Sequence, residues 1–171
     1  MIVVYADIET SGLDPKTGAE ITEVGLIKCN AYWPYDIFYS FFSIKGSIPP
    51  DLVQETGITR EMLAGFPAVQ DRVSLVKNFI GRAPIIAYNA RFEQSFFNHY
   101  GITDVGHLYI DLYPWIKEMR LPTVNNKLQT ILKHYQLVPT FAHRALSDAL
   151  ALHNLVYKLR WMDRLEKVAR I

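Results

Sequence analysis

The stretch Ile2–Thr10, with the sequence IVVYADIET, decides the fold because it is a β-forming run that ends in two carboxylates. Its first part, Ile2–Ile8, is apolar on both alternating faces, as expected of a central strand that is covered on both sides. Asp7 and Glu9 are two residues apart, so their side chains point to the same face of this strand. They stand at its carboxyl end, where open α/β sheets bind their ligands. Solvated carboxylates at a strand end are the plain alternative, but an acidic pair beside a covered strand needs a cation.

The rest of the chain alternates between strand-like and helix-like runs. Three consecutive strands come first, shorter strands then alternate with helices, and no internal repeat, low-complexity tract or linker interrupts them. The expected strands are Ile2–Ile8, Glu20–Cys29, Tyr35–Ile44, Pro84–Tyr88 and Leu108–Asp111. The expected helices are Thr59–Leu63, Ala68–Ile80, Phe92–Tyr100, Leu112–Met119, Lys127–Tyr135 and a last one from about Ala145 onwards. This order predicts one α/β domain over residues 1–171.

Composition excludes several classes of protein. An apolar content of 50% with 13% aromatic residues argues against disorder. The net charge of +1 gives no strongly basic surface for unspecific duplex binding, so any nucleic-acid contact would be local or helped by a partner. Cys29 is the one cysteine, and no apolar run reaches the roughly 18 residues of a membrane helix. Met1 leads directly into the first strand and leaves no room for a signal peptide, so we expect a cytoplasmic protein.

A third acid and a histidine precede or begin the last helix. Asp148 lies within the apolar stripe of that helix, so its carboxylate is half-buried and needs a partner, either a cation or a neighbouring Arg or Lys. His143 can converge on Asp148 only if it lies in the loop before the helix. Histidine is the side chain best matched to proton transfer near neutral pH, although a lone histidine near a helix start is usually a surface residue.

A fourth acid follows the fourth strand. Asn89 and Glu93 fit a helix start, with Asn as the cap and Glu in the first turn. Four carboxylates brought together repel one another by about 4 kcal/mol per pair at ~4 Å and an effective dielectric of ~20. Divalent cations relieve this repulsion, and two ions ~4 Å apart stabilise both the attacking and the leaving oxygen of a displacement at phosphorus. The residues alone therefore indicate phosphoryl chemistry with a histidine base, and leave the substrate and the polarity of attack open.

These residues resemble the three sequence motifs of the DEDDh 3′–5′ exonucleases. The family includes the proofreading epsilon subunit of bacterial DNA polymerase III, ribonuclease T and oligoribonuclease. The resemblance runs from residue 2 to about residue 160. The matching segments are Asp7-x-Glu9-Thr10, Asn89-x-x-Phe92-Glu93 and His143-x-Ala145-x-x-Asp148.

The resemblance implies a ribonuclease H-like fold, a five-stranded mixed sheet with helices on both faces. It implies two Mg²⁺ or Mn²⁺ ions bound by Asp7, Glu9, Glu93 and Asp148, with Asp7 bridging both ions. His143 would deprotonate the attacking water, and the enzyme would release nucleoside 5′-monophosphates from single-stranded DNA or RNA 3′ ends. The resemblance also assigns the terminal nucleotide to a set of substrate-binding residues, namely Thr10, Leu13, Asn89 and Phe92.

Two positions depart from the family pattern. Glu93 stands where the family usually has Asp, which lengthens the carboxylate arm by about 1.5 Å. In Glu55-Thr56-Gly57-Ile58-Thr59, Thr56 replaces the His of a His-Gly-Ile stretch common in epsilon-like members, which weakens an assignment to the proofreading branch. Glu93 supports an alternative, a catalytically weak nucleic-acid-binding or partner-docking module. An endonuclease or transposase on the same fold is a third hypothesis, but it would not need the spacing from His143 to Asp148.

Overall fold

The structure is a computed structural model that describes residues 1–30 and 32–169. A five-stranded sheet forms its centre, with the strand order β3-β2-β1-β4-β5. The long strands β1, β2 and β3 pair antiparallel, whereas β4 and β5 continue the sheet in parallel with β1, so the sheet is mixed as expected. The strands are β1 (Ile2–Thr10), β2 (Ile21–Asn30), β3 (Trp33–Phe41), β4 (Ile85–Ala87) and β5 (Tyr109–Asp111).

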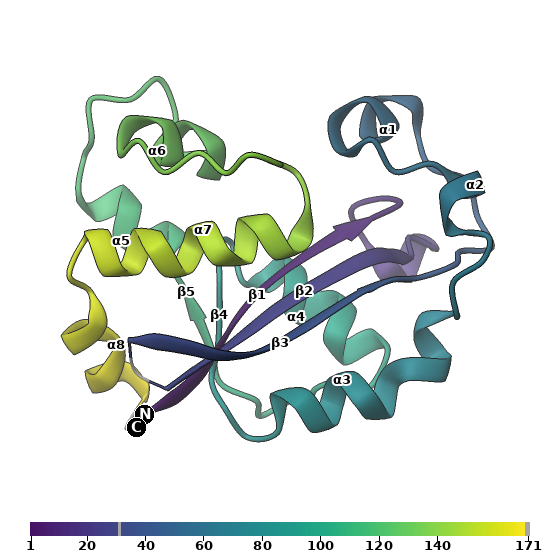
Figure 1. Ribbon diagram of the computed structural model, residues 1–171, viewed down its shortest axis with the longest axis horizontal. Coiled ribbons are helices and arrows are strands. Elements are labelled where there is room, and N and C mark those ends of the chain that lie inside the picture. The colour runs from purple at the N-terminus through teal and green to yellow at the C-terminus, as the bar shows by residue number, and fades with distance from the viewer. Residues whose placement is uncertain (31, 170–171) are drawn as a thin grey trace.

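Helices cover both faces of the sheet, which confirms that part of the expected fold. Figure 1 shows α7 lying above the sheet and α3 below it. None of the helices in the described part of the chain is long and apolar enough to cross a membrane. The helices are α1 (Pro50–Thr56), α2 (Arg60–Leu63), α3 (Val73–Ile80), α4 (Arg91–His99), α5 (Tyr113–Glu118), α6 (Leu128–His134), α7 (Ala145–Lys158) and α8 (Met162–Ala169).

The alternation of side chains along β1 divides the core into two layers. Val4, Ala6 and Ile8 pack with residues of α3 and α4 on one face. Val3 and Tyr5 pack with residues of α5, α7 and α8 on the other. Because side chains alternate along a strand, Asp7 and Glu9 continue the row that begins with Val3 and Tyr5. The acidic pair is therefore on the face that α7 covers.

Several elements differ from the sequence-based expectation; the helix expected over Ala68–Ile80, for example, begins as α3 only at Val73, after a 3-10 turn over Val69–Arg72. No helix was expected between Ile44 and Thr59, but α1 begins there at Pro50, because proline is compatible with the first turn of a helix. The last helix ends at Lys158, and α8 follows after a turn in which Arg160 has a positive φ of 54°. The third strand ends at Phe41 rather than at Ile44, and Ser43 instead forms an isolated parallel bridge with Ala68.

Candidate active site

The carboxylates of β1 and α7 meet at one point. Oxygen atoms of Asp7, Glu9 and Asp148 all lie within 4.8 Å of one another, although the residues are far apart in the chain. Asp7 and Glu9 come from the carboxyl end of β1, and Asp148 comes from the first turn of α7. The register of β1 against β2 shifts between Glu9 and Thr10, so a bulge ends the regular pairing beside the acidic pair.

A glycine in β2 allows α7 to approach the sheet this closely. Gly25 pairs with Asp7, and a Cβ atom at Gly25 would lie 2.2 Å from the backbone nitrogen of Leu146 in the first turn of α7. Real Cβ atoms do not approach backbone atoms so closely, and backbone cannot move aside as a flexible side chain can. The missing side chain therefore sets the distance between Asp148 and the acidic pair.

Burial and mutual repulsion raise the pKa values of these acids. Burial is the main cause of the raised pKa of Asp7, followed by the charges of Glu9, Glu93 and Asp148. Burial and the charge of Glu23 raise the pKa of Glu9 to about 8. Burial also raises the pKa of Asp148, against the lowering effect of its hydrogen bonds. All three carboxyl groups would ionise more readily beside a cation. Carboxylate oxygens are the ligands that Mg²⁺ and Mn²⁺ prefer.

Glu93 lies in the first turn of α4 and is 2% exposed. Burial raises the pKa of its carboxyl group to about 8, and the charges of Asp111 and Glu9 contribute. Its Oε2 atom is buried and has no hydrogen-bond partner in the described part of the chain. Such an atom is costly unless something outside the protein chain binds it, so this oxygen also fits a cation or its water. Glu93 nevertheless stands apart from the close cluster of Asp7, Glu9 and Asp148.

His143 lies in the loop before α7, as the sequence required. Its φ of 58° is a left-handed conformation that side chains other than glycine rarely adopt. Its backbone N–H donates to Oδ2 of Asp148 at 3.0 Å, and its Nδ1 lies 3.4 Å from Oε1 of Glu55 in α1. The loop thus joins the histidine to the acid cluster through its backbone and leaves the imidazole beside α1.

Asp148 has neutral partners rather than a basic one. Gln129 in α6 donates from Nε2 to Oδ1 of Asp148 at 2.9 Å, and the N–H of His143 occupies Oδ2. Among the ion pairs of the described residues, none involves Asp148; the neighbouring Arg144 pairs with Glu23 instead. The salt-bridge explanation of Asp148 is therefore wrong. Each carboxylate oxygen has two lone pairs, so capacity for a cation remains.

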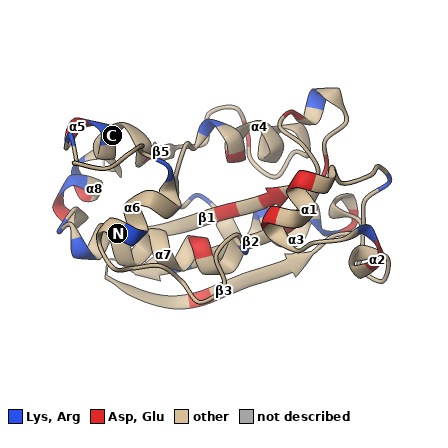
Figure 2. Ribbon diagram, turned by 90° about the horizontal axis from the view of Figure 1, so that it is seen from above, with Lys and Arg blue, Asp and Glu red and all other residues tan. Residues whose placement is uncertain are grey.

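The acids, the histidine and part of the expected nucleotide site line one open cavity of about 440 Å³. Its volume lies within the range of roughly 300–1,000 Å³ that is usual for small-ligand sites. Figure 2 shows acidic segments of β1 and α1 side by side, and both helices α1 and α6 contribute to the wall. The lining residues are Asp7, Ile8, Glu9, Glu55, Tyr88, Asn89, Phe92, Glu93, Lys127, Leu128, Gln129, Thr130, His143 and Asp148.

The four expected substrate-binding residues divide into two pairs. Asn89 and Phe92 line the cavity, whereas Thr10 and Leu13 do not. The hydroxyl of Thr10 donates to the carbonyl of Gly12 at 2.6 Å, and Leu13 is 83% exposed on the turn after β1. Asn89 does not cap α4 as expected; it has a φ of 66°, and its N–H donates to Oδ1 of Asp111 at 2.9 Å.

Sequence reasoning missed two partners of the site. Glu55 belongs to the segment that resembles the His-Gly-Ile stretch, and it contacts His143, whereas the hydroxyl of Thr56 bonds only the local backbone. Gln129 lies in an expected helix without any pattern to mark it. Neither residue has a spacing that relates it to His143 or Asp148, because both contacts join separate elements across the cavity.

Comparison with known proteins gives the family. Residues 4–156 match the RNase_T model, which describes an exonuclease. The DNA polymerase III PolC-type protein of Halalkalibacterium halodurans is 29% identical over 167 residues, which cover 91% of this chain and 11% of the polymerase. The chain therefore spans only about a tenth of the length of this curated relative.

Two solved structures show the same fold. Exonuclease X in complex with 5′-overhanging duplex DNA superposes with a TM-score of 0.71 at 20% identity, covering 99% of this chain and 97% of the other. Exonuclease I of E. coli in complex with a dT13 oligonucleotide gives a TM-score of 0.79 at 16% identity, covering 97% of this chain and 42% of the other. The expected ribonuclease H-like fold is thus confirmed. The family model covers most of the chain, so the chain belongs to the RNase_T exonuclease family, which confirms the expected resemblance to the DEDDh exonucleases.

Proposed function

We propose that the protein removes nucleotides one at a time from the 3′ end of single-stranded nucleic acid and releases nucleoside 5′-monophosphates. The observation that carries the proposal is the convergence of Asp7, Glu9 and Asp148 within 4.8 Å in a cavity that His143 also lines. The cavity and the acids suit a phosphodiester that is bound to divalent metal ions. DNA is the better-supported substrate, since the polymerase relative and both structural neighbours are named for DNA or for a DNA oligonucleotide complex.

Asp7, Glu9 and Asp148 would hold a first Mg²⁺ or Mn²⁺ ion, and Asp7 with Glu93 would hold a second. When bound, these ions polarise the phosphodiester and stabilise the charge of the attacking and leaving oxygens. The chain's own residues position the other reactants. With Nδ1 of His143 directed at Glu55, Nε2 is the nitrogen that accepts a proton from the attacking water. Gln129 holds Oδ1 of Asp148 in place.

Recognition of the terminal nucleotide would use both pairs of candidate residues. Phe92 and Asn89 line the cavity and offer an apolar ring and an amide to a base or sugar. Leu13, exposed on the turn after β1, would wedge against the terminal base, and Thr10 would support that turn through its bond to Gly12. These roles remain proposals. A Leu13→Ala variant with an unchanged KM for single-stranded DNA would remove Leu13 from the site.

A catalytically weak binding module is the second candidate. Glu93, with its longer arm, stands apart from the close cluster of three acids, and this favours the alternative. The residues that a pure scaffold would not need, a buried Asp148 and a cavity-lining His143, favour the nuclease.

The test is digestion of 5′-labelled single-stranded DNA and RNA with Mg²⁺ or Mn²⁺. We expect stepwise shortening from the 3′ end, arrest by EDTA and sharp slowing by a blocked 3′ end. Equally rapid cleavage of a circular strand would instead indicate an endonuclease, and tight binding without cleavage would indicate the binding module.

We also propose that residues 1–171 form one exonuclease domain that works in the cytoplasm with a DNA polymerase. The similarity to a small part of a PolC-type polymerase supports this context. Copurification of this chain with a polymerase subunit would test the partnership. The polymerase subunit should no longer copurify when this chain is denatured.

A further inference from the structure

A half-buried ion pair, Glu23–Arg144, lies beside the acid cluster. Glu23 lies opposite Glu9 in the register of β2 against β1, and Glu23 is 0% exposed. The Nε atom of Arg144 lies 3.2 Å from both carboxylate oxygens of Glu23. Arg144 is the residue between His143 and the start of α7. A carboxylate that is fully buried needs such a partner, so the pair fixes where this segment of chain crosses the sheet.

Two aromatic residues of β3 also contact the guanidinium group of Arg144. Its Nη2 donates to the hydroxyl of Tyr39 at 2.6 Å, and its guanidinium group stacks over the ring of Phe41 at 4.8 Å from the centroid. Burial alone would lower the pKa of Arg144, but the hydrogen bond and charge of Glu23 outweigh it and raise the pKa. The guanidinium is thus held by β2 and β3 together, in a planar, directional arrangement that a lysine could not reproduce.

The backbone on either side of this anchor needs outside support. His143 is in the left-handed region at a φ of 58°, a conformation that persists in non-glycine residues only where the surroundings enforce it. Arg144 is extended and makes no side-chain cap to α7. Asp148 accepts the N–H of His143, and the first turn of α7 presses on Gly25. Glu55 contacts the imidazole of His143, and the side chain of Arg144 provides the further constraint on the segment.

We propose that the Glu23–Arg144 pair is a positioning device that holds His143 over the acid cluster. Its catalytic meaning rests on the proposed function, in which His143 takes a proton from the attacking water. Glu23 and Arg144 do not line the cavity, so we assign their effect on turnover to the histidine, and the separate effect of the Glu23 charge on Glu9 is followed by the metal-binding measurement. A pair that served stability alone could be replaced by neutral groups of similar shape without loss of turnover, whereas a positioning pair could not.

The decisive variant is therefore the double replacement Glu23→Gln/Arg144→Gln, which leaves no unpaired buried charge. The matched control is Glu118→Gln/Arg164→Gln, because Arg164 also makes a short ion pair, at 2.7 Å, and stacks on an aromatic ring, that of Trp115, outside the cavity. Melting temperature, metal binding and turnover of single-stranded DNA are measured for both. For the site variant we expect roughly 10- to 100-fold lower kcat, the scale of loss for a misplaced catalytic group, with KM nearly unchanged. The control keeps its kcat.

A second background shows whether the pair acts through the histidine. In a protein that already carries His143→Ala, the double replacement should lower kcat no further, since the group that it positions is gone. A further loss as large as that in the native background would overturn positioning through His143, and a native kcat in the double variant would overturn the proposal outright. If the double variant does not fold, Arg144→Lys replaces it; the charge is kept and the fork lost, and an unchanged kcat there has the same overturning force.

Nuclear magnetic resonance of the imidazole groups separates this proposal from the proposed function. The His143 signal is assigned by its disappearance in His143→Ala. It should be single and sharp in the native protein and in the control, and broadened or split in the double variant. A native protein without nuclease activity would refute the proposed function while this spectrum still decides the positioning. An unchanged His143 signal in the double variant would refute the positioning whatever the activity.

Discussion

Oε1 of Glu55 lies 3.4 Å from Nδ1 of His143, and both residues line the cavity. Glu55 comes from α1, which Figure 1 shows above the carboxyl end of β1, and His143 comes from the loop before α7. A carboxylate at Nδ1 favours the proton on that nitrogen and leaves Nε2 free as a base. The contact therefore directs Nδ1 towards α1, and in the proposed reaction it would leave Nε2 as the base.

The first prediction follows from this contact. Glu55→Gln keeps the size of the side chain and removes its charge, so kcat should fall by about tenfold, a modest loss because both groups are partly exposed to water. Asp51→Asn on the same helix is the matched control, since Asp51 is an exposed acid that does not line the cavity. Single-turnover digestion of DNA measures both. Equal rates for native protein and Glu55→Gln would show that the contact has no mechanistic role.

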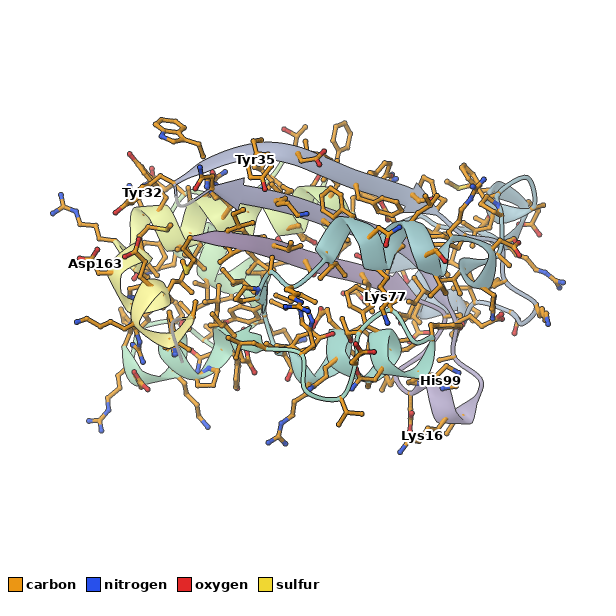
Figure 3. All side chains as sticks on the ribbon, turned by 90° about the horizontal axis from the view of Figure 1, so that it is seen from below. Lys16, Tyr32, Tyr35, Lys77, His99 and Asp163 are labelled. Atoms are coloured by element: carbon orange, nitrogen blue, oxygen red, sulfur yellow. The ribbon has the colours of Figure 1, made fainter. Side chains whose placement is uncertain are left out.

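The second prediction concerns the base itself. His143→Ala should lower kcat by roughly 10²–10⁴-fold, the usual contribution of a general base. Affinity for DNA and for Mn²⁺ should stay nearly constant, because His143 is not a metal ligand in the proposed site. His99→Ala is the control; Figure 3 shows His99 at the periphery of the molecule. Near-normal turnover of His143→Ala would transfer the role of base to another group.

The third prediction tests the longer acid. Glu93→Ala should lower turnover by ~10²-fold or more, because several kcal/mol of charge stabilisation is lost. Glu93→Asp should stay within about tenfold of native turnover, since a water can bridge the small displacement. Turnover of the three proteins on one substrate is compared in Mg²⁺ and in Mn²⁺. Native activity in Glu93→Ala would leave a site of three acids, and a much faster Glu93→Asp would favour the weakened binding module.

The fourth prediction separates ligand from scaffold at Asp148. Asp148→Asn should abolish activity but leave the protein folded. The amide keeps one acceptor oxygen for the two donors, Gln129 and the N–H of His143, a loss of about 1–1.5 kcal/mol, yet it removes a repulsion of about 4 kcal/mol per ionised acid pair at ~4 Å and an effective dielectric of ~20. The melting temperature in EDTA should therefore equal or exceed that of the native protein. A marked decrease would mean that Asp148 serves mainly to hold the loop.

The fifth prediction is a pH dependence of stability without metal. Burial is the main cause that raises the pKa of both Glu9 and Glu93 from 4.5 to about 8. The folded protein therefore binds more protons than the unfolded chain between these values, and the free energy of unfolding falls as the pH rises from about 4.5 to 8. Divalent metal binds the ionised acids and should offset this loss, most strongly near pH 8.

Thermal melts in EDTA and in Mn²⁺, taken from pH 5 to pH 9, check this dependence. The variant Glu9→Gln/Glu93→Gln is the control and should show a flatter profile in EDTA. A native melting temperature that rises with pH in EDTA would contradict the sign of both shifts.

The sheet and the close acid cluster were within reach of the sequence because their signals are local. The side chains of Ile2–Thr10 are apolar on both faces of the strand, and the strand ends in acids. Asp148 interrupts an apolar stripe on a helix. Asp7, Glu9 and Asp148 accordingly meet where the motifs required. The roles of the site residues stay predictions until variants are measured.

The remaining features depend on contacts between distant elements. Glu55 and Gln129 reach the site from α1 and α6, and no periodicity links either residue to its partner. The short helix α1 was not expected, because proline usually interrupts a helix although it is favourable in the first turn. Asparagine is a common N-cap residue, but the N–H of Asn89 donates to Asp111 at the end of a neighbouring strand.

The close approach at Gly25 has a consequence for how inactive variants of this protein are interpreted. Gly25 contributes no functional group, yet the first turn of α7 fits against the sheet only because its side chain is absent. A change to alanine there would push the helix outwards and carry Asp148 and the histidine loop with it. Loss of function in a genetic screen can therefore map to a strand residue that never contacts substrate. Such a variant would be inactive because α7 is displaced, and not because a reacting group is lost.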